Sequence, residues 1–363
     1  MPNLRDYGYK IVQIEVTNRC NMRCTFCPLP ERDLPLRDMK QKEVSDILEE
    51  IAQFEGVEYV AFHQFGETLL YDELWACIAQ SRQLGLACQL TTNGLLLKDE
   101  VIEKILQTPP NILRISLQTL IPKVYAETRG IKVPFNTYMD RLAKTLATLI
   151  DRQHGIDSII TDVAVNDLRY RGKKYWLMRK LGVVNPGDAT ISDPTPEKLR
   201  NYLIDFLKRI QSHSTRFQFS EEQVDKNIES YEMDESKGRN ETAYQLQENN
   251  DILYKEFANG CRMITNHPVQ RALCGTKLLG ILADGTVSCC CADFDGSVGI
   301  GNIFEEKLVD ILERAKPILD GLRNTGELHF ETCKKCRGAP TKLGAWLLQK
   351  KNDALIARRN AAK

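Results

Sequence analysis

Short apolar segments alternate with helical patterns along the first 170 residues of the chain. Residues 10–16, KIVQIEV, alternate apolar and polar side chains as a β-strand does. Four more strands are expected at 57–63, 86–92, 112–118 and 158–165. Helices are expected between them, near 40–54, 72–84, 98–107 and 138–153. Repeated strand–helix units predict an α/β fold whose parallel sheet is open or closes as a partial barrel.

The chain changes character after this region. Residues 172–220 have a helical pattern, and residues 221–256 are polar, with eleven acidic against four basic side chains. We interpret the polar stretch as a solvated helical linker or insertion, with a substrate lid as the alternative. A Cys- and Gly-rich region follows, with a hairpin signal at Asp284-Gly285. We therefore expect four parts, at 1–190 (barrel), 191–260 (linker or insertion), 261–340 (small α+β domain) and 341–363 (helical tail).

Composition and charge restrict the class of protein. The chain has 363 residues, enough for a large core and two domains. Lys and Arg total 49, as do Asp and Glu, so the chain lacks the basic excess that nucleic-acid binding requires. No run of about 18 apolar residues predicts a membrane span, and the first ten residues contain no apolar signal core. We expect a cytoplasmic protein that binds neither nucleic acid nor membrane.

Twelve cysteines are many for such a chain, and their placement is uneven. Three lie at 20–27 and seven between 261 and 336. Cys77 and Cys88 stand apart in apolar surroundings, where we expect buried core thiols. Disulfides are rare in a reducing compartment, so clustered thiols indicate metal binding.

The first cysteine group follows the first expected strand with the spacing C-x3-C-x2-C. Its members are Cys20, Cys24 and Cys27, and a tight loop can direct all three sulfurs to one point. A [4Fe–4S] cluster usually takes four thiolates, so three leave one iron open for a further ligand. A zinc site that borrows a fourth ligand is the alternative.

The stretch EVTNRCNMRCTFCP at 15–28 resembles the cluster loop of the radical S-adenosylmethionine (SAM) superfamily, in which an aromatic residue precedes the third cysteine. Phe26 occupies that position here. The resemblance implies a partial (β/α)6 barrel and a [4Fe–4S] cluster held by the three cysteines. It also implies that the amine and carboxylate of SAM bind the open iron, with adenine packed beside Phe26.

The segment HQFGETLL, after the second strand, is similar to the G-G-E-P segment of the same family, whose backbone and Glu bind the SAM amine. Gly66 and Glu67 match it, whereas Phe65 stands for the first Gly and Thr68 for the Pro. Backbone carbonyls can still accept hydrogen bonds despite these departures. An ordinary strand–helix turn is the alternative interpretation.

The resemblance assigns further SAM or substrate contacts to polar residues after the later strands, namely Asn93, Ser116, Gln118, Arg129 and Asn166. Asn93 can equally form an Asn-Gly turn. Ser116 is expected near the SAM ribose or carboxylate, and Gln118 on the substrate side. Arg129 suits the SAM carboxylate because a guanidinium binds carboxylates in a fork. Its alternative role is a surface ion pair with Glu127.

The second cysteine group has the spacing Cys274-x15-Cys290-x42-Cys333-x2-Cys336. It resembles the shortened SPASM domain called twitch, through CGTKLLGILADGTVSCCCADFDG, IGNI and ETCKKC. The resemblance implies one auxiliary [4Fe–4S] cluster, because no cysteine follows Cys336. A zinc ribbon is the alternative. The choice among Cys289, Cys290 and Cys291 stays open.

These features together predict a radical SAM enzyme that cleaves SAM reductively and abstracts a substrate hydrogen with the resulting 5′-deoxyadenosyl radical. We expect oxidation of a sugar, a cyclitol or a similar natural-product intermediate, with the auxiliary cluster as electron acceptor. The alternatives are epimerisation with Cys261 as hydrogen donor, and peptide maturation, which the early start of the barrel disfavours. The expected partners are that substrate and a one-electron donor such as flavodoxin or ferredoxin. A zinc scaffold or a redox sensor is the non-enzymatic alternative.

Overall fold

The structure is a computed structural model. It describes residues 1–25, 27–29, 32–163, 196–225, 244–246, 252–253, 267–274, 277–291, 293–339 and 341–361. Three residues with predicted roles lie outside these ranges, namely Phe26, Asn166 and Cys261.

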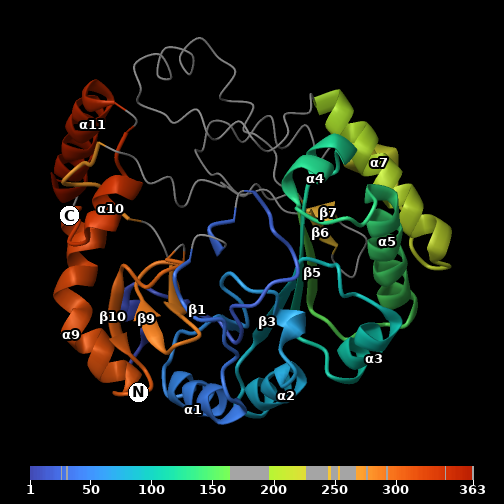
Figure 1. Cartoon of the computed structure of the whole chain (residues 1–363), viewed down its shortest axis with the longest axis horizontal. Helices are drawn as coiled ribbons and strands as arrows, with labels where there is room; N and C mark the ends of the chain where they lie inside the picture. The colour runs from blue at the N-terminus through green and yellow to red at the C-terminus, as the bar shows by residue number, and fades with distance from the viewer. Residues whose placement is uncertain are drawn as a thin grey trace.

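Five parallel strands form the centre of one sheet (Figure 1). They are β1 (Ile11–Ile14), β2 (Tyr59–Ala61), β3 (Cys88–Thr92), β4 (Ile112–Gln118) and β5 (Ser158–Val163), side by side in chain order. The connecting helices are α1 (Gln41–Ile51), α2 (Leu74–Gln83), α3 (Asp99–Gln107), α4 (Pro122–Thr128) and α5 (Phe135–Asp151). The expected α/β fold with a parallel sheet is confirmed. The carboxyl ends of the parallel strands, where such folds bind ligands, therefore meet at one edge of the sheet.

The helices cover one face of the sheet because each has an apolar stripe. In α1 this stripe consists of Val44, Ile47, Leu48 and Ile51, which are at most 1 % exposed and recur at helical spacing. The helix begins where the Glu43 side chain accepts a hydrogen bond from the backbone N–H of Lys40. Cys77 and Cys88 are buried in this core, as expected.

Two short antiparallel strands extend the sheet beyond β5. They are β6 (Tyr244–Leu246), which pairs with β5, and β7 (Ile252–Leu253), which pairs with β6. The prediction of a helical linker over 191–260 is therefore wrong at these strands. It holds at α7 (Pro196–His213), which packs against α5. The strands form because the open edge of β5 offers backbone hydrogen bonds to short apolar segments within an acidic stretch.

The other edge of the sheet joins the amino-terminal and carboxy-terminal parts of the chain. Strand β8 (Leu278–Ile281) pairs parallel with β1, and it continues into β9 (Thr286–Ser288) and β10 (Gly299–Asn302), which pair antiparallel. The expected hairpin is confirmed, and Gly285 makes its turn with a φ of +86°. Figure 1 shows β9 and β10 on the β1 side of the sheet, with β8 between β1 and β9 in the strand order, so the Cys-rich region continues the barrel sheet.

Three helices complete the carboxy-terminal part. They are α9 (Leu308–Asp320), α10 (Glu331–Cys336) and α11 (Lys342–Ala361), with a short π-helix η7 (Gly321–Thr325) after α9. The predicted helical tail is confirmed by α11. No helix in the described ranges is both long enough and apolar enough to cross a membrane.

Candidate active site and auxiliary cysteine pocket

The three amino-terminal cysteines lie together in the loop after β1. Each thiol is partly buried, and burial is the largest cause of the raised pKa of Cys20 and of Cys27, which is about 11 for Cys27. The neighbouring charge of Cys24 also raises both pKa values. Iron binds the thiolate rather than the thiol, so cluster insertion here would release protons.

Gly66, which follows β2, packs closely against the backbone of this loop. A Cβ on Gly66 would lie 2.0 Å from the carbonyl oxygen of Thr17, which is too close for any side chain. The next residue, Glu67, donates its backbone N–H to the carbonyl of Arg19 over 2.8 Å. The Gly-Glu pair therefore holds the backbone of the cluster loop, which is more than an ordinary turn requires.

The carboxylate of Glu67 is buried, with 2 % of the residue exposed. It accepts hydrogen bonds from the hydroxyl of Thr92 (2.7 Å), the backbone N–H of Asn93 (2.7 Å) and the backbone N–H of Leu69 (3.1 Å). Burial raises its pKa, and these hydrogen bonds oppose the shift. The side chain thus connects the ends of β2 and β3 beneath the cluster loop.

Asn93 forms a local turn and also lies beside the cluster loop. Its side-chain oxygen accepts from the backbone N–H of Leu95, which makes a local turn. Its amide group donates to the Asn21 side chain over 2.7 Å and lies 3.9 Å from the sulfur of Cys20. Asn93 therefore stands directly beside the first cysteine.

Arg129 is a buried cation, only 2 % exposed, which overturns its interpretation as a surface ion pair. Its Nη2 donates to the carbonyl of Ser116 over 3.0 Å, whereas its buried Nε has no partner. Glu127 lies instead near Lys123, at 3.9 Å. Burial raises the pKa of Cys24, Cys27 and Glu67, and the positive charge of Arg129 partly opposes this shift in each of them. An incompletely paired buried guanidinium fits an anionic group such as a carboxylate.

Gln118 ends β4 in a strained conformation. Its φ is +69°, unusual for a residue with a side chain, and the pairing of β4 with β5 shifts register just before it. The side-chain oxygen is buried without a partner. Such strain persists only where the surroundings enforce it and is frequent at ligand sites. Gln118 and Ser116 thus lie at the strand end nearest Arg129.

Residues 128–130 form a second support for the cluster loop, which we did not predict from the sequence. The carbonyl of Thr128 accepts from the backbone N–H of Thr25, and the sulfur of Cys24 lies 3.8 Å from the carbonyl oxygen of Arg129. A Cβ on Gly130, whose φ is +61°, would lie 2.2 Å from the carbonyl oxygen of Arg23. A glycine after a candidate arginine is the signal that could have revealed this contact.

The departures at Phe65 and Thr68 have structural reasons. The Phe65 ring packs edge-on against Phe294 of the carboxy-terminal part, with 6.2 Å between ring centroids. The hydroxyl of Thr68 donates to the carbonyl of Phe62, and Thr68 begins the short 3-10 helix η3 (Thr68–Leu70). The phenyl ring thus replaces a glycine to form a contact with the auxiliary region.

A buried ion pair also joins the two parts, and we did not foresee it. The carboxylate of Glu15, at the end of β1, accepts two hydrogen bonds of 2.8 Å from Arg32, and both side chains are at most 3 % exposed. The same carboxylate accepts from the backbone N–H of Ala283 over 3.1 Å. Glu15 therefore ties the segment after the cluster loop to the carboxy-terminal hairpin.

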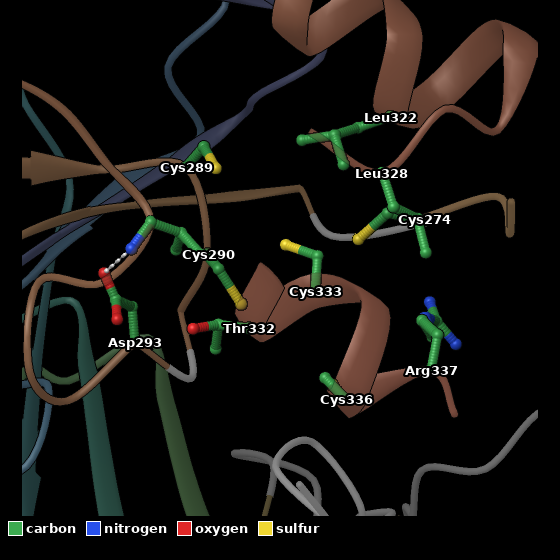
Figure 2. A pocket seen from close by; sticks show the side chains of 11 residues that line it. Cys274, Cys289, Cys290, Asp293, Leu322, Leu328, Thr332, Cys333, Cys336 and Arg337 are labelled. Atoms are coloured by element: carbon green, nitrogen blue, oxygen red, sulfur yellow. Dashed lines mark hydrogen bonds between the residues drawn. The ribbon is translucent and has the colours of Figure 1, made fainter. Parts of the chain in front are cut away.

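The carboxy-terminal cysteines surround a pocket between the hairpin and α10 (Figure 2). Five of them line it, namely Cys274, Cys289, Cys290, Cys333 and Cys336. Burial and the neighbouring thiols raise the pKa of Cys333 to about 12. The cavity volume is about 50 Å³. One buried water molecule needs about 10–15 Å³ of such volume, so the pocket can hold a group of several atoms.

The residues that line the pocket reduce the number of candidate cluster ligands among Cys289, Cys290 and Cys291. Cys291 is not among its lining residues, whereas Cys289 and Cys290 are. Cys289 is only 2 % exposed, and its carbonyl accepts a hydrogen bond from the hydroxyl of Tyr9. Figure 2 shows the Cys290 side chain directed toward α10, which carries Cys333.

Within the described ranges, no three His, Cys, Asp or Glu side chains lie close enough together to hold a single metal ion. None of the eleven cysteines in these ranges forms a disulfide bond.

Comparisons with known proteins agree with this geometry. Residues 14–159 match the radical SAM superfamily, and residues 274–337 match the SPASM iron–sulfur cluster-binding domain. A GTP 3′,8-cyclase of Limosilactobacillus fermentum is 33 % identical over 151 residues, which are 40 % of this chain and 42 % of that protein. A tungsten-containing aldehyde ferredoxin oxidoreductase cofactor-modifying protein of Pyrococcus furiosus is 25 % identical over 111 residues, or 31 % of each chain. The chain thus spans less than half the length of these curated relatives.

The crystal structure of Streptococcus suis SuiB has a similar fold. It superposes with a TM-score of 0.52 and 17 % sequence identity, over 88 % of this chain and 70 % of that one. The family matches indicate a SAM-binding [4Fe–4S] cluster in the barrel and an auxiliary iron–sulfur cluster in the carboxy-terminal domain. The chain therefore contains a radical SAM superfamily region at residues 14–159 and, after it, an iron–sulfur cluster-binding region of the SPASM family at residues 274–337.

Proposed function

We propose that this enzyme oxidises an alcohol group of a small polyhydroxylated molecule, such as a sugar or a cyclitol. The observation that carries the proposal is the thiol-lined pocket on the hairpin that continues the barrel sheet through the β1–β8 pairing. Oxidation of an alcohol to a ketone removes one hydrogen atom, and then one electron and one proton. The second step needs an electron acceptor at a fixed place, and the pocket thiols would hold one.

We assign the barrel cluster to Cys20, Cys24 and Cys27. When bound, this cluster and SAM supply reductive cleavage of SAM and abstraction of a substrate hydrogen. The Arg129 guanidinium would pair with the SAM carboxylate, since its Nε is buried and unpaired. Gly66 would let the backbone of the cluster loop lie close to the end of β2, and Glu67 would hold that loop through its backbone N–H, which donates to the carbonyl of Arg19.

We assign the auxiliary cluster to Cys274, Cys290, Cys333 and Cys336. These thiols come from three separate segments, which the carboxy-terminal fold brings to one pocket. Tyr9 supports the hairpin through its hydrogen bond to the carbonyl of Cys289. The apolar walls of the pocket would keep water from the cluster, and this limits loss of the electron to solvent-borne oxidants.

The similarity to GTP 3′,8-cyclases supports a second candidate function, the radical cyclisation of GTP. The match covers 40 % of this chain, so it leaves most of the substrate-binding side untested. Incubation of the reduced, SAM-loaded enzyme with GTP, followed by mass spectrometry, separates the two candidates. Consumption of GTP would favour cyclisation over alcohol oxidation.

The first experiment is to measure iron and sulfide per chain after anaerobic reconstitution. We expect about eight irons in the wild type and about four in a Cys20/Cys24/Cys27→Ala triple variant. The matched control is Cys77→Ala, which removes a buried core thiol and should leave the iron content unchanged. No iron in the wild type would overturn both cluster assignments.

Activity is tested next with SAM, a reductant and a panel of sugars and cyclitols. Dithionite replaces the physiological one-electron donor, for which flavodoxin and ferredoxin are the candidates. We expect 5′-deoxyadenosine to form together with a product lighter by two hydrogens. Deoxyadenosine with an unchanged substrate mass and an inverted centre would indicate epimerisation and contradict the proposed oxidation.

A further inference from the structure

The sheet face opposite the helices carries polar residues in register. Gln13 of β1 lies beside Ala61 of β2, which lies beside Gln89 of β3. Two residues further along the strands, Thr91 lies beside Arg114 of β4. Residues in register on neighbouring parallel strands point to the same face, so these side chains share one surface.

Three polar atoms on this face are buried without partners. Gln13 and Gln89 are 8 % and 2 % exposed, and the side-chain oxygen of each lacks a hydrogen bond. The Nδ1 atom of His63, which follows β2, is also buried and unpaired. Buried polar groups in folded proteins nearly always have partners, so three open ones on one face require an explanation.

Parallel strands covered on both faces normally read as continuous apolar runs. Here only one face of the strands is apolar. Val12, Val60 and Leu90, on the face toward the helices, are fully buried in the apolar core, whereas the opposite face carries the glutamines. The polar face therefore departs from the usual composition, although water is largely excluded from it. The fold alone gives no reason to place glutamines there, and a bound polar molecule does.

The polar face lies directly below the candidate SAM contacts. Arg114 precedes Ser116 by two residues on β4, about 6–7 Å along a strand. Gln89 precedes Asn93 by four residues, about 13 Å. A molecule resting on this face would thus be below the strand ends at which Arg129 and Cys20 are located.

The unpaired atoms of Gln13, His63 and Gln89 include both hydrogen-bond donors and acceptors. The Gln13 amide nitrogen faces the Nε2 atom of His63 at 3.5 Å, which leaves the Nδ1 atom to carry the ring proton. Burial and the nearby Arg114 lower the pKa of His63 to about 3, so the ring is neutral. Gln89 donates to Thr91 over 2.9 Å, and its oxygen faces no partner. Hydroxyl groups both donate and accept, so they match this set.

We propose that Gln13, His63 and Gln89 form a polar floor inside the barrel that selects a polyhydroxylated substrate. This inference rests on the proposed function and names the residues that would recognise its substrate. The floor would bind the hydroxyl groups remote from the reacting carbon and hold that carbon toward the strand ends. Apolar substrates would leave the floor atoms unpaired and would therefore be rejected.

The first test measures thermal stability without any substrate. The Gln13→Leu/His63→Leu double variant removes both partners of the 3.5 Å contact together with their unpaired buried atoms, so Tm should rise by about 1–3 °C. The matched control is Gln53→Leu, at an exposed position just after α1, where we expect no change. A lower Tm in the double variant would show that the fold itself uses these side chains, and it would overturn the inference.

The second test measures binding to the SAM-loaded holoprotein. The probes are myo-inositol and D-glucose, with cyclohexanol as the apolar comparison, and the readout is the shift in Tm. We expect a polyol to raise Tm in the wild type and in Gln53→Leu, and this shift to disappear in Gln13→Leu and Gln89→Leu. No polyol shift, a polyol shift that persists in both variants, or a shift with cyclohexanol alone would each overturn the proposed floor.

Formation of 5′-deoxyadenosine from SAM and dithionite separates this inference from the proposed function. If deoxyadenosine forms but no polyol binds, the floor is wrong and the radical chemistry stands. If a polyol binds through Gln13 and Gln89 but no deoxyadenosine forms, the floor stands and the proposed reaction fails.

Discussion

Replacing Gly130 with alanine should detach the cluster loop from its support at residues 128–130. The added methyl group would lie 2.2 Å from the carbonyl oxygen of Arg23, which belongs to the backbone between Cys20 and Cys24. A backbone atom cannot rotate away as a flexible side chain can. Either the loop or the segment after α4 must therefore move.

The size of this effect can be separated into two parts. A φ of +61° places alanine in the left-handed region, which costs about 1–2 kcal/mol. Forcing an extra methyl group into packed surroundings adds about 1–3 kcal/mol. Gly85 isolates the first part, because its φ is +73° and a Cβ there would meet nothing within 4 Å. We thus expect about 1–2 kcal/mol for Gly85→Ala and about 2–5 kcal/mol for Gly130→Ala.

The assay combines anaerobic urea unfolding with iron analysis of both variants. Gly130→Ala should lose part of the barrel iron, since its loop carries Cys24, whereas Gly85→Ala should retain all of it. Equal destabilisation and equal iron content in the two variants would refute the reasoning. It would mean that the loop moves freely and that residues 128–130 give it no support.

Three further substitutions test other contacts. Glu15→Gln should lower the free energy of unfolding by about 3–5 kcal/mol in urea, because it leaves Arg32 buried without its counter-charge; a loss below about 1 kcal/mol, as at an exposed pair, would contradict this. Arg129→Lys should weaken SAM binding by about tenfold to a hundredfold in equilibrium dialysis, because an ammonium group cannot bind a carboxylate through two parallel N–H groups as a guanidinium does. Unchanged affinity would exclude Arg129 as the partner of the SAM carboxylate. Cys290→Ser should lose about four irons, while Cys291→Ser should lose none; the reverse result would reassign the ligand.

The parallel strands could be predicted because short apolar runs of strand length alternate with segments of helical periodicity along the chain. The first cysteine group could be predicted because its members lie close together, at 20–27, whereas the second, spread over 274–336, is predicted from its resemblance to the twitch domain. In contrast, the strands β6 and β7 have only three and two residues within an acidic stretch, and they are held by pairing of β6 with the edge of β5 and of β7 with β6. Their existence depends on a partner that the local sequence does not reveal.

The alternation at 10–16 predicted a strand correctly but did not indicate what its polar side would contact. Polar residues at alternate positions usually face water, yet Gln13 and Glu15 are 8 % and 0 % exposed. One faces the interior of the barrel, and the other forms a buried ion pair. Likewise, Arg129 could not be distinguished from a surface cation, because burial depends on the whole fold.

The pairing of β1 with β8 also has a consequence for how the chain folds. Glu15 and its partner Ala283 are 268 residues apart, so the first strand of the sheet gains its outer neighbour only late in synthesis. Until then its open edge can pair with another chain, and contacts of such long range form slowly. We therefore expect nascent chains to aggregate or to need a chaperone before β8 emerges from the ribosome. Delivery of iron to Cys20, Cys24 and Cys27 would then be most productive after the carboxy-terminal hairpin has docked.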